Sequence, residues 1–153
     1  EMNADLEVMR YFPKTLNKAE SEEAIWNYRE HFRERRYTYF AIEVLSTGIF
    51  AGFIGLKYQD FEAPYTPAVD IGWRLRKEFW GKGYATEGAR RCLVYAFDTL
   101  GIDRVVSHCP AVNNPSERVM QKIGMHKMGE FDHPWLTESP QLQRCVWYET
   151  KKA

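Results

Sequence analysis

The chain has 153 residues, of which 44% are hydrophobic, 15% aromatic and 27% charged. This length and composition favour a single globular domain, residues 1–153, with a buried core and a solvated surface. Its 21 basic and 21 acidic residues give a formal charge of zero; no overall field would attract nucleic acid or an anionic membrane, so we expect neither as a partner.

The N-terminal part predicts two helices. Asp5 to Arg10 carries closely spaced apolar residues before Pro13, and a short helix is expected there. Glu20 to Arg36 has apolar residues near helical spacing and no Gly or Pro inside. This pattern predicts a longer helix, with Ser21 as its candidate N-cap.

The next segments predict three strands. Tyr37 to Leu45 and Ile49 to Tyr58 are rich in aromatic and β-branched residues, and Ser46-Thr47-Gly48 between them supplies a turn. The two segments should therefore pair as a hairpin. Asp60 to Pro67 holds two prolines and is interpreted as a loop before a strand at Ala68 to Leu75.

The second half predicts alternating helices and strands. Ala85 to Leu100 has helical periodicity that ends at Gly101, a residue suited to a helix C-terminus. The other predicted elements are strands at Arg104 to Cys109, Met125 to Phe131 and Gln143 to Thr150, and a short helix at Ser116 to Ile123. This order implies an α/β fold whose mixed sheet contains a parallel crossover around the long helix.

The cysteines and histidines suggest neither a disulfide framework nor a metal site. Cys92, Cys109 and Cys145 are odd in number and include no C-x-x-C pair. His, Cys and carboxylate residues show no metal-ligand spacing, so we predict no metal. No apolar run approaches the ~20 residues that cross a bilayer, and no secretory leader is recognised. These features together predict a cytoplasmic protein.

The segment with the clearest chemistry lies between the third strand and the long helix. The strand Asp70 to Leu75 is followed by Gly81-Lys82-Gly83, after which Tyr84-Ala85-Thr86 opens the helix. Two glycines allow a ligand to approach the backbone closely, and the unpaired N–H groups of a helix N-terminus favour phosphate oxygens. The alternative is that the glycines only turn the chain.

Two familiar phosphate-binding motifs do not fit this turn. A Walker A motif needs glycine where Arg76 stands and Ser or Thr after Lys82, where Gly83 stands. A dinucleotide fingerprint needs a third glycine at the position of Thr86.

The sequence resembles the GNAT superfamily of acetyltransferases in two motifs. Trp80-Gly81-Lys82-Gly83-Tyr84-Ala85 matches motif A, [Q/R]-x-x-G-x-[G/A], except that Trp80 replaces Gln or Arg. With Thr86-Glu87 it is similar to the ribosomal-protein-alanine acetyltransferase branch. Asn113-Asn114-Pro115-Ser116 and Lys122-Ile123-Gly124-Met125 resemble a downstream segment of that branch.

The resemblance implies a fold and a donor substrate. The implied fold is a mixed, mostly antiparallel sheet with a central splayed parallel strand pair and flanking helices; because relatives begin with one more strand, we expect that strand to be missing here. The implied donor is acetyl-CoA, with its pyrophosphate on the backbone of motif A and its pantetheine arm along the third strand. The residues implied to bind it are Ile71, Trp73, Leu75, Gly81, Lys82, Gly83, Tyr84, Ala85, Thr86, Asn113 and Ser116.

The implied reaction is attack of an amine on the thioester, which needs a proton acceptor and a way to stabilise the leaving thiolate. Asp70 is the leading general base, and Glu43 is a weaker candidate. Ser116 could hydrogen-bond the sulfur, or it could be an N-cap. Relatives often use a tyrosine acid where this chain has Met120, and a backbone N–H near Trp73 could stabilise the oxyanion.

The leading interpretation is therefore direct acetyl transfer to a primary amine, either a protein N-terminus or a small molecule. A covalent route through Cys109 is disfavoured because no ordered base accompanies it. The alternative function is a catalytically silent acyl-CoA-binding regulatory module. We expect a monomer or a homodimer.

Overall fold

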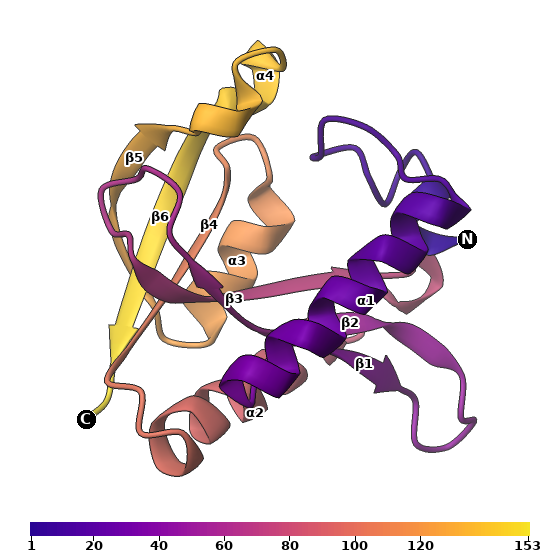
Figure 1. The fold of residues 1–153 in the computed structure, drawn as a ribbon, viewed down its shortest axis with the longest axis horizontal. Helices are drawn as coiled ribbons and strands as arrows, with labels where there is room; N and C mark the ends of the chain where they lie inside the picture. Colours follow the sequence, from indigo (N-terminus) through magenta and orange to yellow (C-terminus); the bar gives the residue numbers. More distant parts are fainter.

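The computed structural model describes all residues, 1–153. The chain forms a six-stranded sheet with helices on both faces (Figure 1). The strand order is β1-β2-β3-β4-β6-β5. The strands are β1 (Tyr39–Glu43), β2 (Phe50–Gln59), β3 (Ala68–Leu75), β4 (Arg104–Pro110), β5 (His126–Asp132) and β6 (Arg144–Lys151). The helices are α1 (Lys18–Arg35), α2 (Tyr84–Val94), α3 (Asn114–Lys122) and α4 (Pro140–Gln143), and a π-helical turn (Tyr95–Thr99) continues α2.

One strand pair in the sheet is parallel, and it separates part way along. β3 pairs with β4 only at Val69 with Val105 and at Asp70 with Val106, whereas all the other pairs are antiparallel. Beyond Asp70 the two strands diverge into a V (Figure 1). The expected mixed sheet with a central splayed parallel pair is therefore confirmed.

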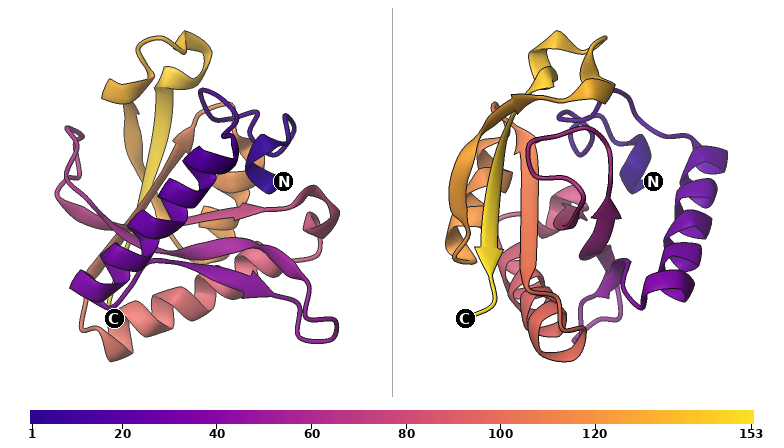
Figure 2. Two further views of the ribbon diagram at one scale, coloured as in Figure 1. Left: turned by 45° about the vertical axis from the view of Figure 1, so that its right-hand side comes forward. Right: turned by 60° about the vertical axis from the view of Figure 1, so that its left-hand side comes forward.

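Helices α1 and α2 lie on opposite faces of the sheet (Figure 2). The ring of Tyr28 in α1 lies 5.6 Å from that of Phe53 in β2. Ile54, which follows Phe53 in β2, is buried in the core cluster that contains Ala89 of α2. Because successive strand residues point to opposite faces, this contact pattern places the main core on the α2 side.

Local capping explains where the structure departs from the predicted helices. Helix α1 is capped by Asn17, not by Ser21, through a capping box in which Asn17 and Glu20 bond each other's backbone N–H groups. The expected helix at Asp5 to Arg10 was also wrong: the Asp5 carboxylate caps the segment, but only one helical backbone hydrogen bond follows, from the Met9 N–H to the Asp5 carbonyl, and the residues form turns.

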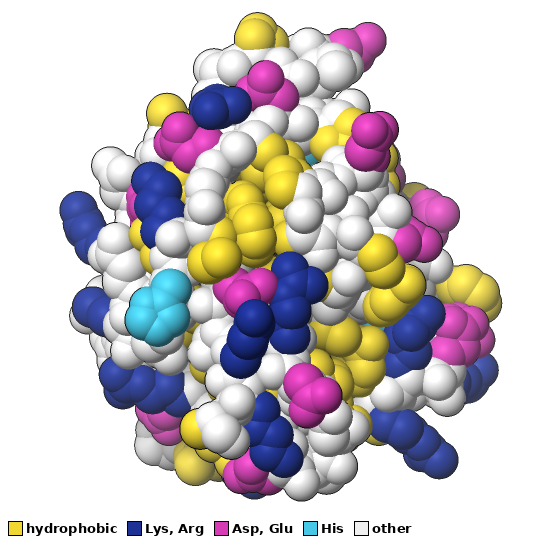
Figure 3. All heavy atoms as spheres, turned by 90° about the vertical axis from the view of Figure 1, so that its left-hand side faces the viewer, with side chains coloured by type: hydrophobic (Ala, Val, Ile, Leu, Met, Phe, Trp, Pro, Cys, Tyr) yellow, Lys and Arg dark blue, Asp and Glu magenta, His cyan; other side chains and the backbone are white.

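The surface matches the balanced charge of the chain. On the face seen in Figure 3, basic and acidic side chains are interspersed, with no patch of a single sign. No helix combines the length and the apolar character needed to span a membrane.

Candidate functional site

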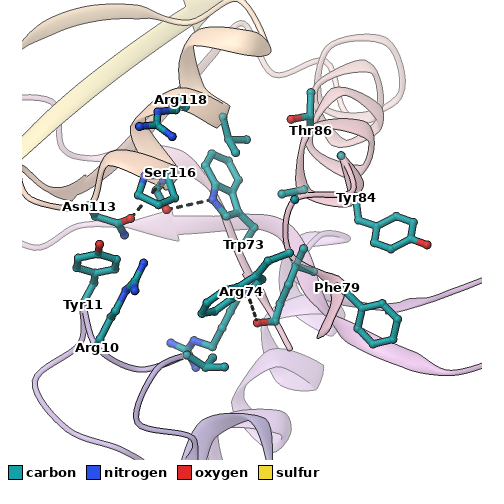
Figure 4. Close-up of a pocket in the computed structure, with 18 of the residues that line it drawn as sticks. Arg10, Tyr11, Trp73, Arg74, Phe79, Tyr84, Thr86, Asn113, Ser116 and Arg118 are labelled. Atoms are coloured by element: carbon teal, nitrogen blue, oxygen red, sulfur yellow. Dashed lines mark hydrogen bonds between the residues drawn. The ribbon is translucent and has the colours of Figure 1, made fainter. Parts of the chain in front are cut away.

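Two cavities flank the open end of the β3–β4 pair. The first, of about 460 Å³, is bounded by the end of β3, the glycine turn, the start of α2, α3 and the N-terminal segment (Figure 4). The second, of about 440 Å³, is bounded by residues of α1, β1, β2, β3 and β4 and by the loop after β5. Residues that line both cavities are Tyr11, Phe12, Trp73, Arg74, Asn113 and Ser116.

The glycine turn presents free backbone donors to the first cavity. Gly81 and Gly83 have φ angles of 69° and 80°, in the left-handed region that favours glycine. Gly83 is the N-cap of α2 and makes no side-chain cap, and the first helical hydrogen bond runs from the Glu87 N–H to the Gly83 carbonyl. Nothing lies within 4 Å of a Cβ built on either glycine. The turn therefore fits an anion such as a pyrophosphate.

Three side chains link the two cavities at the mouth of the V. The Trp73 indole N–H donates to Ser116 Oγ at 3.3 Å, and Asn113 Oδ1 accepts the Ser116 backbone N–H at 3.2 Å (Figure 4). Asn113 is thus the N-cap of α3, which corrects the alternative role considered for Ser116. Because the indole can only donate, the Ser116 hydroxyl proton remains available for another acceptor.

Asp70 is a buried carboxylate in the second cavity. Only 4% of the surface of Asp70 is exposed. Oδ1 accepts the Tyr39 hydroxyl at 2.9 Å and Oδ2 accepts the Gln59 amide at 3.1 Å. Burial raises the pKa of Asp70 to about 6, although the hydrogen bonds from Tyr39 and Gln59 act in the opposite direction. The group therefore titrates near neutrality, the range suited to a general base.

The phenol of Tyr39 reaches Asp70 from across the sheet. Tyr39 in β1 is opposite Gly55 in β2, which is opposite Gly72 in β3. A Cβ on Gly72 would lie 3.2 Å from the Tyr39 hydroxyl oxygen. The missing side chain at Gly72 makes room for the phenol beside the carboxylate.

The histidine and the cysteine nearest to Asp70 are electrically neutral. His108 Nδ1 lies 3.9 Å from Asp70 Oδ2 and within hydrogen-bond distance, 2.9 Å, of the Tyr65 hydroxyl. Burial lowers the pKa of His108 to about 4, so the two groups form no ion pair at neutral pH. Burial also raises the pKa of the Cys109 thiol to about 12, which leaves it protonated and a poor nucleophile.

The structure brings most of the predicted site residues to these two cavities. The first is lined by Trp73, Leu75, Gly81, Gly83, Tyr84, Ala85, Thr86, Asn113 and Ser116. Asp70 and Ile71 line the second. Lys82 and Glu43 line neither; both are exposed.

Sequence reasoning missed Tyr39, Gln59 and Arg74. All three line the second cavity, and the first two hold the Asp70 carboxylate. Only the strand register could have revealed Tyr39, through the glycines at positions 55 and 72 that lie beside each other.

Comparisons with known proteins agree with this architecture. A family model described as an acetyltransferase (GNAT) domain matches residues 1–126. The uncharacterized N-acetyltransferase YnaD of Bacillus subtilis (strain 168) is 30% identical over 131 residues, which are 86% of this chain and 73% of that protein.

Two solved structures share the fold. An acetyltransferase (GNAT family) from Bacillus anthracis aligns with a TM-score of 0.80 and 24% identity over 98% of this chain and 84% of that chain. The ribosomal-protein-S5-alanine acetyltransferase from Vibrio fischeri aligns with a TM-score of 0.75 and 14% identity over 98% of this chain and 85% of that chain.

Proposed function

Because the chain belongs to the GNAT family of N-acetyltransferases, we propose that it transfers the acetyl group of acetyl-CoA directly to a primary amine that enters from the opposite side of the splayed strands. The observation that carries the proposal is the meeting of the two cavities at Trp73, Asn113 and Ser116. One cavity offers free backbone donors for a pyrophosphate, and the other contains a buried carboxylate for the incoming amine.

The donor would bind along the first cavity. Its pyrophosphate would accept hydrogen bonds from the N–H groups that open α2, and its pantetheine arm would run beside the unpaired length of β3. The thioester would then lie at the mouth of the V, beside Trp73 and Ser116, which line both cavities. Asn113, whose Oδ1 caps α3, still has its amide N–H groups to donate to the arm.

The amine must lose a proton as it attacks. Attack forms the amide C–N bond, and Asp70 takes the proton, directly or through one water molecule. Tyr39 and Gln59 hold the carboxylate in place through their two hydrogen bonds.

The C–S bond then breaks and leaves a thiolate. Ser116 can donate its hydroxyl proton in a hydrogen bond to that sulfur, since its oxygen already accepts from Trp73. The neutral, buried thiol of Cys109 supports direct transfer over a covalent acyl-cysteine.

The test is calorimetric titration of acetyl-CoA into the wild type and into Gly83→Trp. Wild type should bind in the micromolar range, and the variant should not, because an indole at the helix N-cap would occupy the pyrophosphate site. Gly48→Trp is the matched control: Gly48 also has a left-handed φ of 70° and open space around it, but it lies in the β1–β2 turn. No binding by the folded wild type would refute the proposal.

A second measurement separates catalysis from binding alone. CoA release should accelerate with at least one member of a panel of primary amines. Tight acetyl-CoA binding without release across the whole panel would instead support an acyl-CoA-binding module.

A further inference from the structure

Arg74 lines both cavities. In the proposed reaction the first is the donor cavity, for acetyl-CoA, and the second is the acceptor cavity, for the amine. Arg74 follows Asp70 by four residues in β3, so both side chains are on the same face of the strand. Its guanidinium carbon lies 4.1 Å from the ring centroid of Phe12 and 5.0 Å from that of Phe53. The two rings hold the guanidinium at the cavity wall.

The guanidinium has no acidic partner in the protein. Nη1 donates to Asn3 Oδ1 at 2.9 Å, whereas Nε is buried without any hydrogen-bond partner. None of the ion pairs of the chain includes Arg74. A desolvated cation without a counter-charge is costly, and the contacts with the two rings offset only part of that cost.

With Arg74 included, the lining of the second cavity has an excess of positive charge. The acidic and basic side chains that line it are Lys57, Arg74, Asp70 and two histidines, His108 and His133. Burial lowers the pKa of both histidines to about 4, so they are neutral at pH 7. Two cations therefore face one carboxylate, and an acceptor with several amines would add to the imbalance.

We infer that the acceptor is an amine that also carries a carboxylate or a similar oxyanion, with the anion bound by Arg74 and the amine directed to Asp70. This inference rests on the proposed function. A guanidinium can donate two parallel hydrogen bonds, as a fork, to an oxyanion, and within the protein the guanidinium of Arg74 uses only its Nη1 donor, toward Asn3. The Cα atoms of residues i and i+4 in a strand are about 13 Å apart, which leaves room for a spacer between amine and acid.

The spacer would pass an apolar wall. The aromatic residues that line the acceptor cavity are Tyr11, Phe12, Tyr28, Tyr39, Phe53, Phe61 and Trp135. An aliphatic or aromatic spacer would bury surface there, while the charged ends of the molecule would pair with Arg74 and Asp70.

The inference is tested with pairs of amines that differ mainly in the acid group. The pairs are ε-aminocaproate against hexylamine, and para-(aminomethyl)benzoate against benzylamine, because both acids have a spacer between the amine and the carboxylate. For each, kcat/KM is measured with saturating acetyl-CoA and corrected for the fraction of neutral amine. In at least one pair the acid should exceed its partner by about tenfold or more, the size expected of a charge-assisted hydrogen bond.

Variants assign that preference to Arg74. In Arg74→Gln the preference should fall to about twofold or less, and Arg74→Lys, which keeps the charge but loses the fork, should retain an intermediate preference. Arg76→Gln is the matched control, because Arg76 lies two residues further on, lines neither cavity and bonds Phe50 and Glu78. It should keep the wild-type preference.

Three results would overturn the inference. The first is that no acid exceeds its neutral partner, including the case in which no acid reacts. The second is a preference that survives in Arg74→Gln while that variant melts at a lower temperature, which would make Arg74 a structural residue. The third is that Arg74→Gln changes the KM for acetyl-CoA and leaves kcat/KM for the amines unchanged. If wild type binds acetyl-CoA and acetylates only neutral amines, this inference fails and the proposed function stands.

Discussion

The chemistry of Asp70 depends on its surroundings more than on its residue type. An exposed aspartate would be a weak base at neutral pH, because its pKa lies near 4. Burial raises the pKa of Asp70 to about 6, and donors on both oxygens fix the carboxylate in one orientation. Both effects suit Asp70 to the proposed role of general base.

The pH dependence of acetylation tests this role. Below a pH of about 6 Asp70 is protonated and cannot accept a proton. For an acceptor whose amine titrates well above neutrality, log kcat/KM should rise with slope one as the amine deprotonates, and with slope two where Asp70 must also ionise. In Asp70→Asn the steeper limb should disappear and the plateau should fall by about a hundredfold or more. An unchanged profile would remove Asp70 from the proton transfer.

The same shift predicts an effect on stability. The pKa of Asp70 is raised in the folded state, so this group stabilises the fold at low pH and loses that contribution as the pH rises through about 6. The lowered pKa values of His108 and His133 act in the opposite direction in wild type and variant alike. Denaturant unfolding should therefore show that wild type loses stability relative to Asp70→Asn between about pH 4 and about pH 8. The comparison is independent of any substrate.

At the scale of elements, close contact between α2 and β2 fixes the helix that carries the glycine turn. A Cβ on Gly88 would lie 2.4 Å from Cδ1 of Ile54, which is fully buried. Overpacking against a buried side chain costs roughly 1–3 kcal/mol, and alanine recovers about 1 kcal/mol of helix propensity, so Gly88→Ala should destabilise the fold by about 1 kcal/mol. Chemical denaturation measures the change.

Ile54→Val provides the matched test of this contact, because it deletes the Cδ1 that the new methyl group would meet. Alone it should cost about 0.5–1.5 kcal/mol. Combined with Gly88→Ala it should be less destabilising than the sum of the two changes. If the two free-energy changes simply add, the methyl group added at position 88 does not contact Cδ1 of Ile54, and the helix has shifted to accommodate it.

Some elements of the fold could be predicted from the sequence, and others could not. The strand Ala68 to Leu75 was predicted with its observed bounds, because its β-branched residues lie between clear turn signals. Ser21 was wrong as an N-cap because capping depends on which side chain reaches back to the free N–H groups, and Asn17 does so. The glycine turn could be predicted because left-handed φ angles, observed at Gly81 and Gly83, are a local preference of glycine.

The partners of Asp70 could not be predicted in this way. Tyr39 and Gln59 lie 31 and 11 residues from it in the chain and reach it from β1 and β2, the two strands on one side of β3. That arrangement depends on strand register and on the room left at Gly72, and neither is a local property.

For the whole molecule, the N-terminal segment is part of the walls of both cavities. Glu7, Val8 and Arg10 line the first cavity, and Tyr11 and Phe12 line both. Acetyl-CoA at a hundred times its Kd should raise the free energy of unfolding by about 2.7 kcal/mol. Hydrogen exchange should slow at residues 7–12 and 81–86 on binding, with β5 as the internal reference. Equal slowing throughout would contradict a local site.

The shared wall at Trp73, Asn113 and Ser116 has a kinetic consequence for the proposed reaction. If donor and acceptor approach this wall from the two cavities and no residue stores the acetyl group, both substrates must be bound at the same time. Double-reciprocal plots should therefore intersect instead of running parallel. Product CoA should compete with acetyl-CoA, and the acetylated product should compete with the amine.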